Sequence, residues 1–178
     1  MHYSKKHHLE LKDIVIVAIL IAIQVVLARF LSISLWNLKI GFSFVPIFIA
    51  ARKLGTFEAV LVAGLGDFIG AILFPIGPYF PGFTVTAILM ALCNGLLFHK
   101  HCDLKRIVFS VVINQLLGSL LLNTLWISIL YSKAYTILLV TRVFQTIVMT
   151  FFQIAVGYLL LVKQSRFLDR LVPQHRMN

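Results

Sequence analysis

Long apolar runs alternate with short polar or basic segments along the whole chain. Six runs match the length or composition of membrane-spanning helices, at about residues 13–31, 40–51, 56–73, 84–98, 107–131 and 134–162. The second run is short for a complete crossing, so we expect it to be tilted or partly re-entrant. The pattern predicts an all-α, polytopic membrane protein in which a single domain, residues 1–178, contains six transmembrane helices.

The amino-acid composition also indicates that the chain lies in a membrane. Of its 178 residues, 60% are hydrophobic and only 12% are charged. A soluble domain has roughly 45–50% apolar residues and about 25% charged residues. A core of this size cannot bury the excess apolar surface, so we expect the helices to expose it to the lipid bilayer.

The basic residues indicate how the helices are oriented. With six spans and a cytoplasmic N-terminus, the inner segments hold 12 of the 16 basic residues, the outer segments hold three, and Arg142 lies within the last span. This split follows the positive-inside rule, and an odd number of spans would spoil it. We therefore expect both termini in the cytoplasm. The same clustering accounts for the net charge of +10 without nucleic-acid binding.

Arg142 is a cation inside an apolar run, where a charge is costly and usually functional. Because its guanidinium stays charged, we expect it to face the protein interior, a watery cavity or the outer interface. One side of the same helix carries Arg142, Gln145, Thr146, Met149 and Gln153. This stripe could bind a ligand, or its polar members could form hydrogen bonds between helices.

The preceding span offers a second polar stripe. On ideal helical geometry Gln115, Asn123 and Trp126 fall within an arc of about 80°. Asp67 is the only acidic residue well inside a span. Its carboxylate could accept hydrogen bonds from the N–H groups of a heterocycle, pair with Arg142, or cap a broken helix.

The predicted outer loops combine cations with aromatic rings, partly within a stretch rich in proline and glycine. The candidate binding residues of these loops are Arg29, Lys39, Phe42, Phe44, Phe83 and Thr84. Rings that stack and cations that hold carboxylates suit a flat anionic ligand. The alternative is an aromatic belt with snorkelling cations at the outer membrane interface.

Small residues recur at a spacing of four, as in Ala18 and Ala22 and in Ala59 and Ala63. Such pairs let helix backbones approach closely in lipid, either within the protein or against another membrane subunit.

Several kinds of chemistry lack their motifs. The chain has no GxxxxGK[ST] loop and no GxGxxG after a strand, so we do not expect it to hydrolyse ATP or bind a dinucleotide. Its six acidic residues and its histidines form no pattern of a metal site or a catalytic cluster. The sequence therefore predicts no enzyme, no metal site and no cofactor.

Four segments carry a more specific pattern, namely Arg29–Ile33, Lys39–Pro46, Gly66–Gly70 and Phe74–Thr84. Together they resemble the folate-specific S components (FolT) of energy-coupling factor (ECF) transporters. The resemblance covers nearly the whole chain, and residues 39–84 are its most specific part. It implies a bacterial cell-membrane subunit that captures folate near its outer face for ATP-driven uptake.

The resemblance also implies partners: a transmembrane coupling protein (EcfT) and two ATPase subunits (EcfA and EcfA′). The S component would topple in the membrane to carry its site inward, and Ala18 and Ala22 match the family's alanine motif for docking on the coupling protein. The expected folate-binding residues are Arg29, Lys39, Trp126 and Arg142, followed by Phe42, Phe44, Asp67, Phe83, Thr84 and Asn123.

Three alternatives are compatible with these residues. The chain could be an S component for another vitamin, such as riboflavin, thiamine or a queuosine precursor. A small membrane enzyme would need a cluster of acids or histidines at one membrane face, and the sequence contains none. A purely structural subunit would leave Arg142 and the aromatic loop without a purpose.

Overall fold

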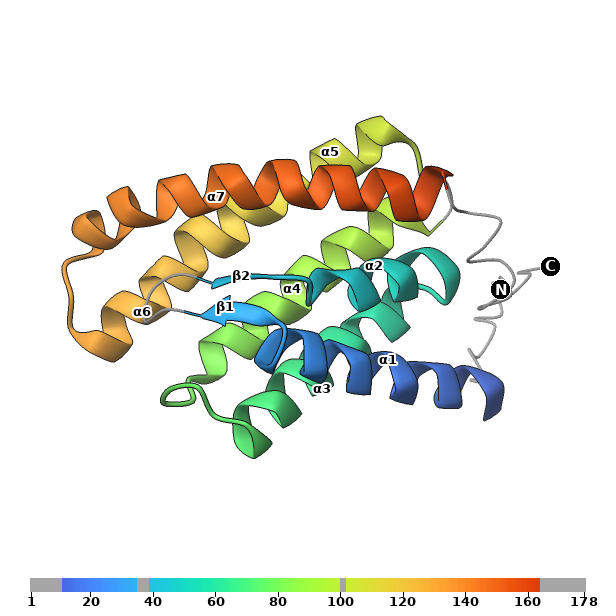
Figure 1. Ribbon diagram of the computed structural model, residues 1–178, viewed down its shortest axis with the longest axis horizontal. Helices are drawn as coiled ribbons and strands as arrows, with labels where there is room; N and C mark the ends of the chain where they lie inside the picture. Colours follow the sequence, from blue (N-terminus) through green and yellow to red (C-terminus); the bar gives the residue numbers. More distant parts are fainter. Residues whose placement is uncertain (1–10, 35–38, 100–101, 164–178) are drawn as a thin grey trace, which may run out of the picture.

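The computed structural model describes residues 11–34, 39–99 and 102–163, which form an elongated bundle of helices (Figure 1). Two of the longest helices contain a π-helical segment, labelled η. The elements are α1 Leu11–Arg29, β1 Ser32–Ser34, β2 Lys39–Gly41, α2 Phe44–Lys53, α3 Thr56–Leu73, α4 Pro81–Phe98, α5 Leu104–Ile113, η1 Asn114–Leu122, α6 Asn123–Tyr131, α7 Tyr135–Tyr158 and η2 Leu159–Lys163.

These elements make six helical units, because α5, η1 and α6 form one continuous helix and α7 continues into η2. Among the described residues, five units are long and apolar enough to cross a membrane. The exception is α2, whose 10 residues extend about 15 Å across a hydrocarbon core of about 30 Å. The prediction of an all-α membrane protein with six helices is confirmed, including one helix that is short for a full crossing.

A small antiparallel hairpin includes residue 40, where the hydropathy pattern predicted the start of a helix. Strands β1 and β2 pair Ile33 with Ile40, and α2 begins only at Phe44. The two strands approach closely at Gly41, where an added Cβ would lie 2.5 Å from the Cβ of Ser32. Hydropathy alone does not separate a short apolar strand from the start of a helix, so the hairpin was not predicted.

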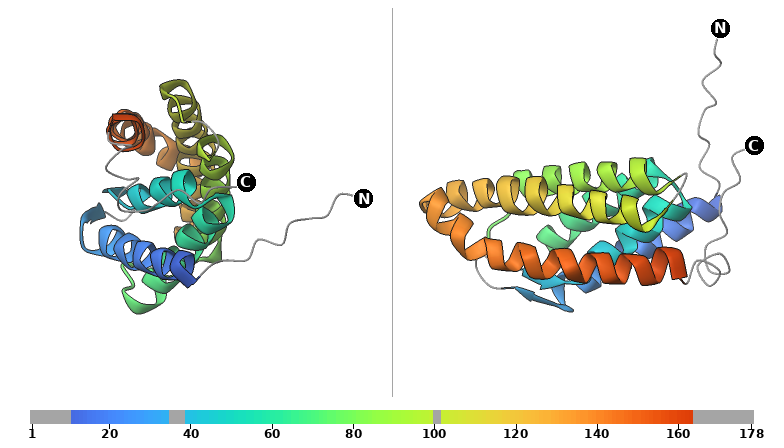
Figure 2. Two further views of the ribbon diagram at one scale, coloured as in Figure 1. Left: turned by 90° about the vertical axis from the view of Figure 1, so that its right-hand side faces the viewer. Right: turned by 90° about the horizontal axis from the view of Figure 1, so that it is seen from above.

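Helices α1 to α4 pack together, and the α5–α6 unit and α7 form an antiparallel pair beside them (Figures 1 and 2). The hydrophobic core lies around α2 and the facing side of α3, where Phe48, Ala51, Ala59 and Ala63 are at most 1% exposed. Small side chains let helices approach closely without a large apolar residue between them. A second close approach between helices occurs where Gly95 of α4 meets the start of α3 at Thr56.

The start of α1, the end of α2, the start of α5 and the end of η2 lie at the same end of the bundle (Figure 1). Arg52 and Arg106 are at this end, and both interact with the end of α4. Nη1 of Arg52 donates to the carbonyl oxygens of Phe98 (3.4 Å) and His99 (3.0 Å), and Nη1 of Arg106 donates to that of Leu97 (3.4 Å). Cations are favourable at a helix C-terminus, where carbonyl oxygens lack helical partners.

Candidate functional site

Arg142 lies on the buried face of α7, about two turns after the helix begins at Tyr135. Its side chain is only 5% exposed, and its Nη2 donates a hydrogen bond of 3.0 Å to the carbonyl oxygen of Ser119 in η1. Gln145, Thr146 and Met149 share this face and are at most 6% exposed, whereas Gln153 is partly buried. The helical spacing correctly grouped these residues, because α7 is regular over this stretch.

The facing surface of the α5–α6 unit is also polar. Gln115 is 5% exposed, Ser119 is 9% exposed and Thr124 is fully buried. Within the described part of the protein, several buried oxygen atoms in this region have no hydrogen-bond partner: Gln115 Oε1, Asn123 Oδ1, Thr124 Oγ1 and Thr146 Oγ1. Leaving a buried polar atom unpaired costs about 1–3 kcal/mol. Their concentration between two helices is therefore typical of a site that receives a polar ligand.

The π-helix η1 changes which residues of α6 face inward. In a π-helix each N–H bonds five residues back, so the side chains beyond it are rotated relative to a continuous α-helix. As a result Thr124 and Ile127 are the buried residues of α6, whereas Asn123 and Trp126 are partly exposed. Ideal α-helical geometry therefore does not hold across η1.

Trp126 faces the beginning of α4. Its indole Nε1 donates a hydrogen bond of 2.9 Å to Oγ1 of Thr86, and its ring lies 5.5 Å from that of Phe80, centroid to centroid. Phe83 also packs against Phe80, edge-on at a centroid distance of 6.2 Å. The end of the loop rich in proline and glycine is thereby joined to α6.

Asp67, Thr84 and Arg29 meet at one end of α1, α3 and α4. Oγ1 of Thr84 donates a hydrogen bond of 2.8 Å to Oδ2 of Asp67, and the hydroxyl of Tyr79 lies 3.3 Å from Oγ1 of Thr84. The charge of Asp67 also acts on Arg29, whose guanidinium runs along the backbone of Gly70. The structure thus brings three of the predicted binding residues into one network.

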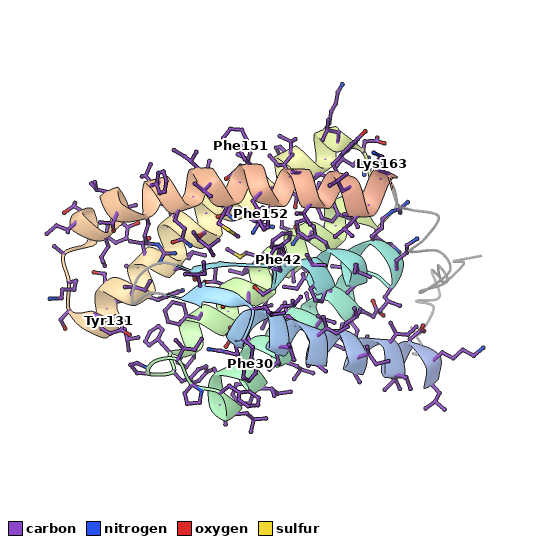
Figure 3. All side chains as sticks on the ribbon, in the orientation of Figure 1. Phe30, Phe42, Tyr131, Phe151, Phe152 and Lys163 are labelled. Carbon is purple, nitrogen blue, oxygen red and sulfur yellow. The ribbon has the colours of Figure 1, made fainter. Side chains whose placement is uncertain are left out.

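The predicted aromatic residues of the first loop differ in their surroundings. Phe44 is 8% exposed and belongs to the hydrophobic core, whereas Phe42 is 44% exposed. Both rings pack edge-on against Phe152 of α7, at centroid distances of 5.0 Å for Phe42 and 5.9 Å for Phe44. Figure 3 shows Phe152 directed toward Phe42 and the neighbouring Phe151 on the opposite side of α7. These contacts attach the segment that joins the hairpin to α2 to helix α7.

The backbone of Lys39 pairs with that of Ser34 in the hairpin. The side chain of Lys39 is outside the part of the protein that the structure describes, as is Trp36 of the same loop. The predicted role of Lys39 therefore stays a prediction.

The two alanine pairs of the sequence have opposite surroundings. Ala18 and Ala22 of α1 are exposed, whereas Ala59 and Ala63 of α3 are completely buried. The pair in α3 allows close packing within the bundle. The pair in α1 lies on an outward apolar face that remains available to another membrane protein.

Three residues near these networks were not singled out from the sequence, namely Gln24, Thr86 and Thr124. Gln24 of α1 is 4% exposed, and its amide oxygen lies against the backbone of Gly66 in α3, where an added Cβ would overlap it. A polar residue in the middle of an apolar span was the signal that identified Arg142, and it would also have found Gln24. Threonine is common in membrane helices, so Thr86 and Thr124 carried no comparable signal.

No group of three or more histidine, cysteine, aspartate or glutamate side chains that could hold a metal ion occurs among residues 11–34, 39–99 and 102–163. The polar groups described above are amides, hydroxyls, guanidinium groups and the carboxylate of Asp67, which accepts a hydrogen bond from Thr84. Apart from that carboxylate, they suit recognition of an organic anion by hydrogen bonds and charge.

Comparison with known proteins extends this picture. Residues 12–161 match the family model described as "ECF transporter, substrate-specific component". A similar protein is the folate transporter FolT of Clostridium novyi (strain NT), 38% identical over 133 residues that cover 74% of this chain and 77% of that protein. The folate transporter FolT of Leuconostoc mesenteroides subsp. mesenteroides is 30% identical over 163 residues, which cover 88% of both chains.

The fold is also similar to that of a solved structure, a crystal structure of FolT bound with folic acid. The two share 30% sequence identity and superimpose with a TM-score of 0.81. The match covers 85% of this chain and 95% of the solved chain. The similarity therefore extends over most of the chain rather than a single motif.

Proposed function

The chain belongs to the family of substrate-specific components of ECF transporters, and we propose that it is the membrane subunit that captures folate for ATP-driven import. It is a binding subunit and not an enzyme, since its relatives are transporters. Hydrolysis of ATP belongs to partner subunits, consistent with the absence of a phosphate-binding loop from the sequence.

The observation that carries the choice of an anionic ligand is the buried guanidinium of Arg142. A cation inside a membrane-spanning helix is costly, and this guanidinium is only 5% exposed beside η1, where its Nη2 donates to the carbonyl oxygen of Ser119. A ligand carboxylate would bring the opposite charge to this site, and a carbonyl oxygen of a ligand ring could accept a hydrogen bond from the guanidinium. Folate has both kinds of group.

The buried oxygen atoms of Gln115 and Thr146 support a position for the pterin ring of folate between α7 and η1. Because α7 runs antiparallel to η1 and Arg142 contacts Ser119, Thr146 and Gln115 lie at about the same depth, four residues away in each chain direction. Both contribute a buried oxygen with no hydrogen-bond partner in the described part of the protein. We propose that these oxygens, with Asn123, accept hydrogen bonds from the N–H groups of the pterin.

The network of Arg29, Asp67 and Thr84 supports a position for the glutamate end of the ligand. Arg29 lies at the end of α1, and Asp67 and Thr84 hold each other beside it. We propose that Arg29 and Lys39 bind the glutamate carboxylates while Asp67 and Thr84 orient Arg29. The aromatic rings of Phe42, Phe83 and Trp126 would cover the flat part of the ligand, with Phe44 supporting Phe42 from the core.

The coupling protein EcfT and the ATPase subunits EcfA and EcfA′ are the proposed partners. An outward apolar face of α1 includes Ala18 and Ala22, and small side chains let a second membrane helix approach closely. We propose that this face docks on EcfT. We also propose that the end of the bundle with Arg52 and Arg106 faces the cytoplasm of a bacterial cell, with both termini, as the positive-inside rule predicts.

A titration of the purified protein tests the ligand assignment. Folic acid and 5-formyltetrahydrofolate should bind and compete with each other, whereas riboflavin and thiamine should not displace them. Native mass spectrometry of the same preparation should reveal any vitamin that co-purifies. Tight binding of riboflavin or thiamine, with no binding of either folate, would refute the proposal.

A further inference from the structure

Thr86, in the second turn of α4, has both of its hydrogen-bonding capacities in use. Its side chain is 1% exposed, and Oγ1 donates a hydrogen bond of 3.0 Å to the carbonyl oxygen of Gly82. Because the hydroxyl hydrogen is directed to Gly82, the lone pairs of the oxygen are available to the indole N–H of Trp126, 2.9 Å away. A valine or an alanine at this position could not make either bond.

Gly82 provides the backbone surface on which the indole ring of Trp126 packs. An added Cβ at Gly82 would lie 2.6 Å from Cδ2 of Trp126 and 2.6 Å from Cε1 of Phe80. The ring of Trp126 therefore lies directly on the first turn of α4, with Phe80 tilted by 38° beside it. Trp126 is held by a hydrogen bond at its N–H, by backbone at one face and by an aromatic ring next to it.

We propose that Thr86 is a positioning residue of the ligand site: it fixes the plane of Trp126 so that the indole presents its ring, and not its N–H, to the ligand. This inference rests on the proposed function, in which Trp126 covers the flat part of folate. A ring that is already immobilised loses little side-chain freedom when the ligand binds, which favours affinity.

The same contact joins α4 to α6 and could serve only to hold two helices together. The two roles predict different effects of Thr86→Val on affinity. If Thr86 positions the indole for the ligand, Thr86→Val weakens binding, and removing the hydroxyl has no further effect on affinity once the indole is gone. If the bond only joins the helices, Thr86→Val lowers the midpoint of thermal unfolding of the ligand-free protein but leaves the affinity of the folded protein unchanged.

The experiment is a double-mutant cycle measured by titration with folic acid. Thr86→Val should weaken binding by about fivefold, the loss expected when one side chain must be immobilised by the ligand. Thr86→Ser keeps the hydroxyl and should restore the affinity. In a Trp126→Phe background, Thr86→Val should change the affinity no further. Thr86→Ala provides the same comparison if Thr86→Val does not fold.

Tryptophan fluorescence supplies a readout that does not depend on affinity. In a Trp36→Phe background Trp126 is the remaining tryptophan of the two in the chain. Its emission maximum should shift in Thr86→Val, which removes the hydrogen bond to the indole, and return in Thr86→Ser. Unchanged affinity in a folded Thr86→Val variant, or equal effects with and without Trp126, would overturn the inference alone. Failure of the wild-type protein to bind folic acid would refute the proposed function as well.

Discussion

The guanidinium of Arg142 is hydrogen-bonded to the carbonyl oxygen of Ser119 across 3.0 Å, and this bond joins α7 to a π-helical turn of the preceding unit. In a π-helix each N–H bonds to the carbonyl group five residues back, and π-helical turns often occur at functional sites. Arg142 thus forms a bond between helices, and we propose that the same group also supplies a charge to the ligand site.

Replacing Arg142 by alanine should weaken folic acid binding at least tenfold, equivalent to about 1.4 kcal/mol. The variant loses the buried charge that we assign to the ligand, and it should still fold because it also loses the cost of burying that charge. Phe144→Ala is the matched control, since Phe144 is on the same helix but 73% exposed. An unchanged dissociation constant in a folded Arg142→Ala variant would refute the assignment of Arg142 to the ligand site.

Replacing Ala18 and Ala22 together by leucine should leave folic acid binding intact but prevent assembly and uptake. The two positions are exposed on α1, where larger side chains would keep a partner helix at a distance. Co-purification with the coupling protein and uptake of labelled folate measure the effect. Ala155→Leu, at an exposed alanine of α7, should assemble normally. The docking role is wrong if the double variant assembles as well as this control.

Gly95→Ala should destabilise the fold more than Gly64→Ala. An added Cβ at Gly95 would lie 2.5 Å from Cα of Thr56, a backbone atom, whereas at Gly64 it would meet only the side chain of Ile88 at 3.0 Å. Overpacking costs typically about 1–3 kcal/mol when the surroundings cannot move. Thermal unfolding in detergent compares the two variants, and equal midpoints would argue against the close approach of α3 and α4.

Cys102, in the loop between α4 and α5, should react slowly with thiol reagents. Burial raises the pKa of its thiol from 9.0 to about 11. Since the thiolate is the reactive form, alkylation in a Cys93→Ser background should continue to accelerate up to about pH 11. The folded thiol holds its proton more tightly than the unfolded one, so the fold also loses stability as the pH rises through this range. A rate that levels off near pH 9 would contradict the burial.

The two polar stripes were not equally predictable. The stripe around Arg142 could be assigned from the sequence because α7 follows regular geometry between Leu138 and Met149. The stripe around Gln115 could not be assigned from the sequence, because η1 rotates the side chains of the residues that follow it in the helix. Within η1, Gly118 leaves room for the side chain of Met90 from α4. Hydrophobic periodicity contains no information about such a contact.

The network of Arg29, Asp67 and Thr84 shows the same limit at a single residue. The sequence offered three partners for Asp67, and the structure supplies a fourth, the hydroxyl of Thr84, together with the nearby charge of Arg29. Asp67 and Thr84 are 17 positions apart in the chain, on different helices. Which of several distant polar groups a carboxylate meets is decided by the packing of those helices.

By itself the sequence determined that this is a membrane protein, that it has six helices, and which ends of those helices carry the basic residues. Hydrophobicity and charge belong to each side chain wherever it is, so their order along the chain is sufficient for these conclusions. Only the tertiary structure decided that Arg142 meets Ser119, that Trp126 rests on Thr86, and that Ala18 and Ala22 face outward while Ala59 and Ala63 do not. These relations depend on the rotation and pairing of helices, which are set by close packing between segments far apart in the chain.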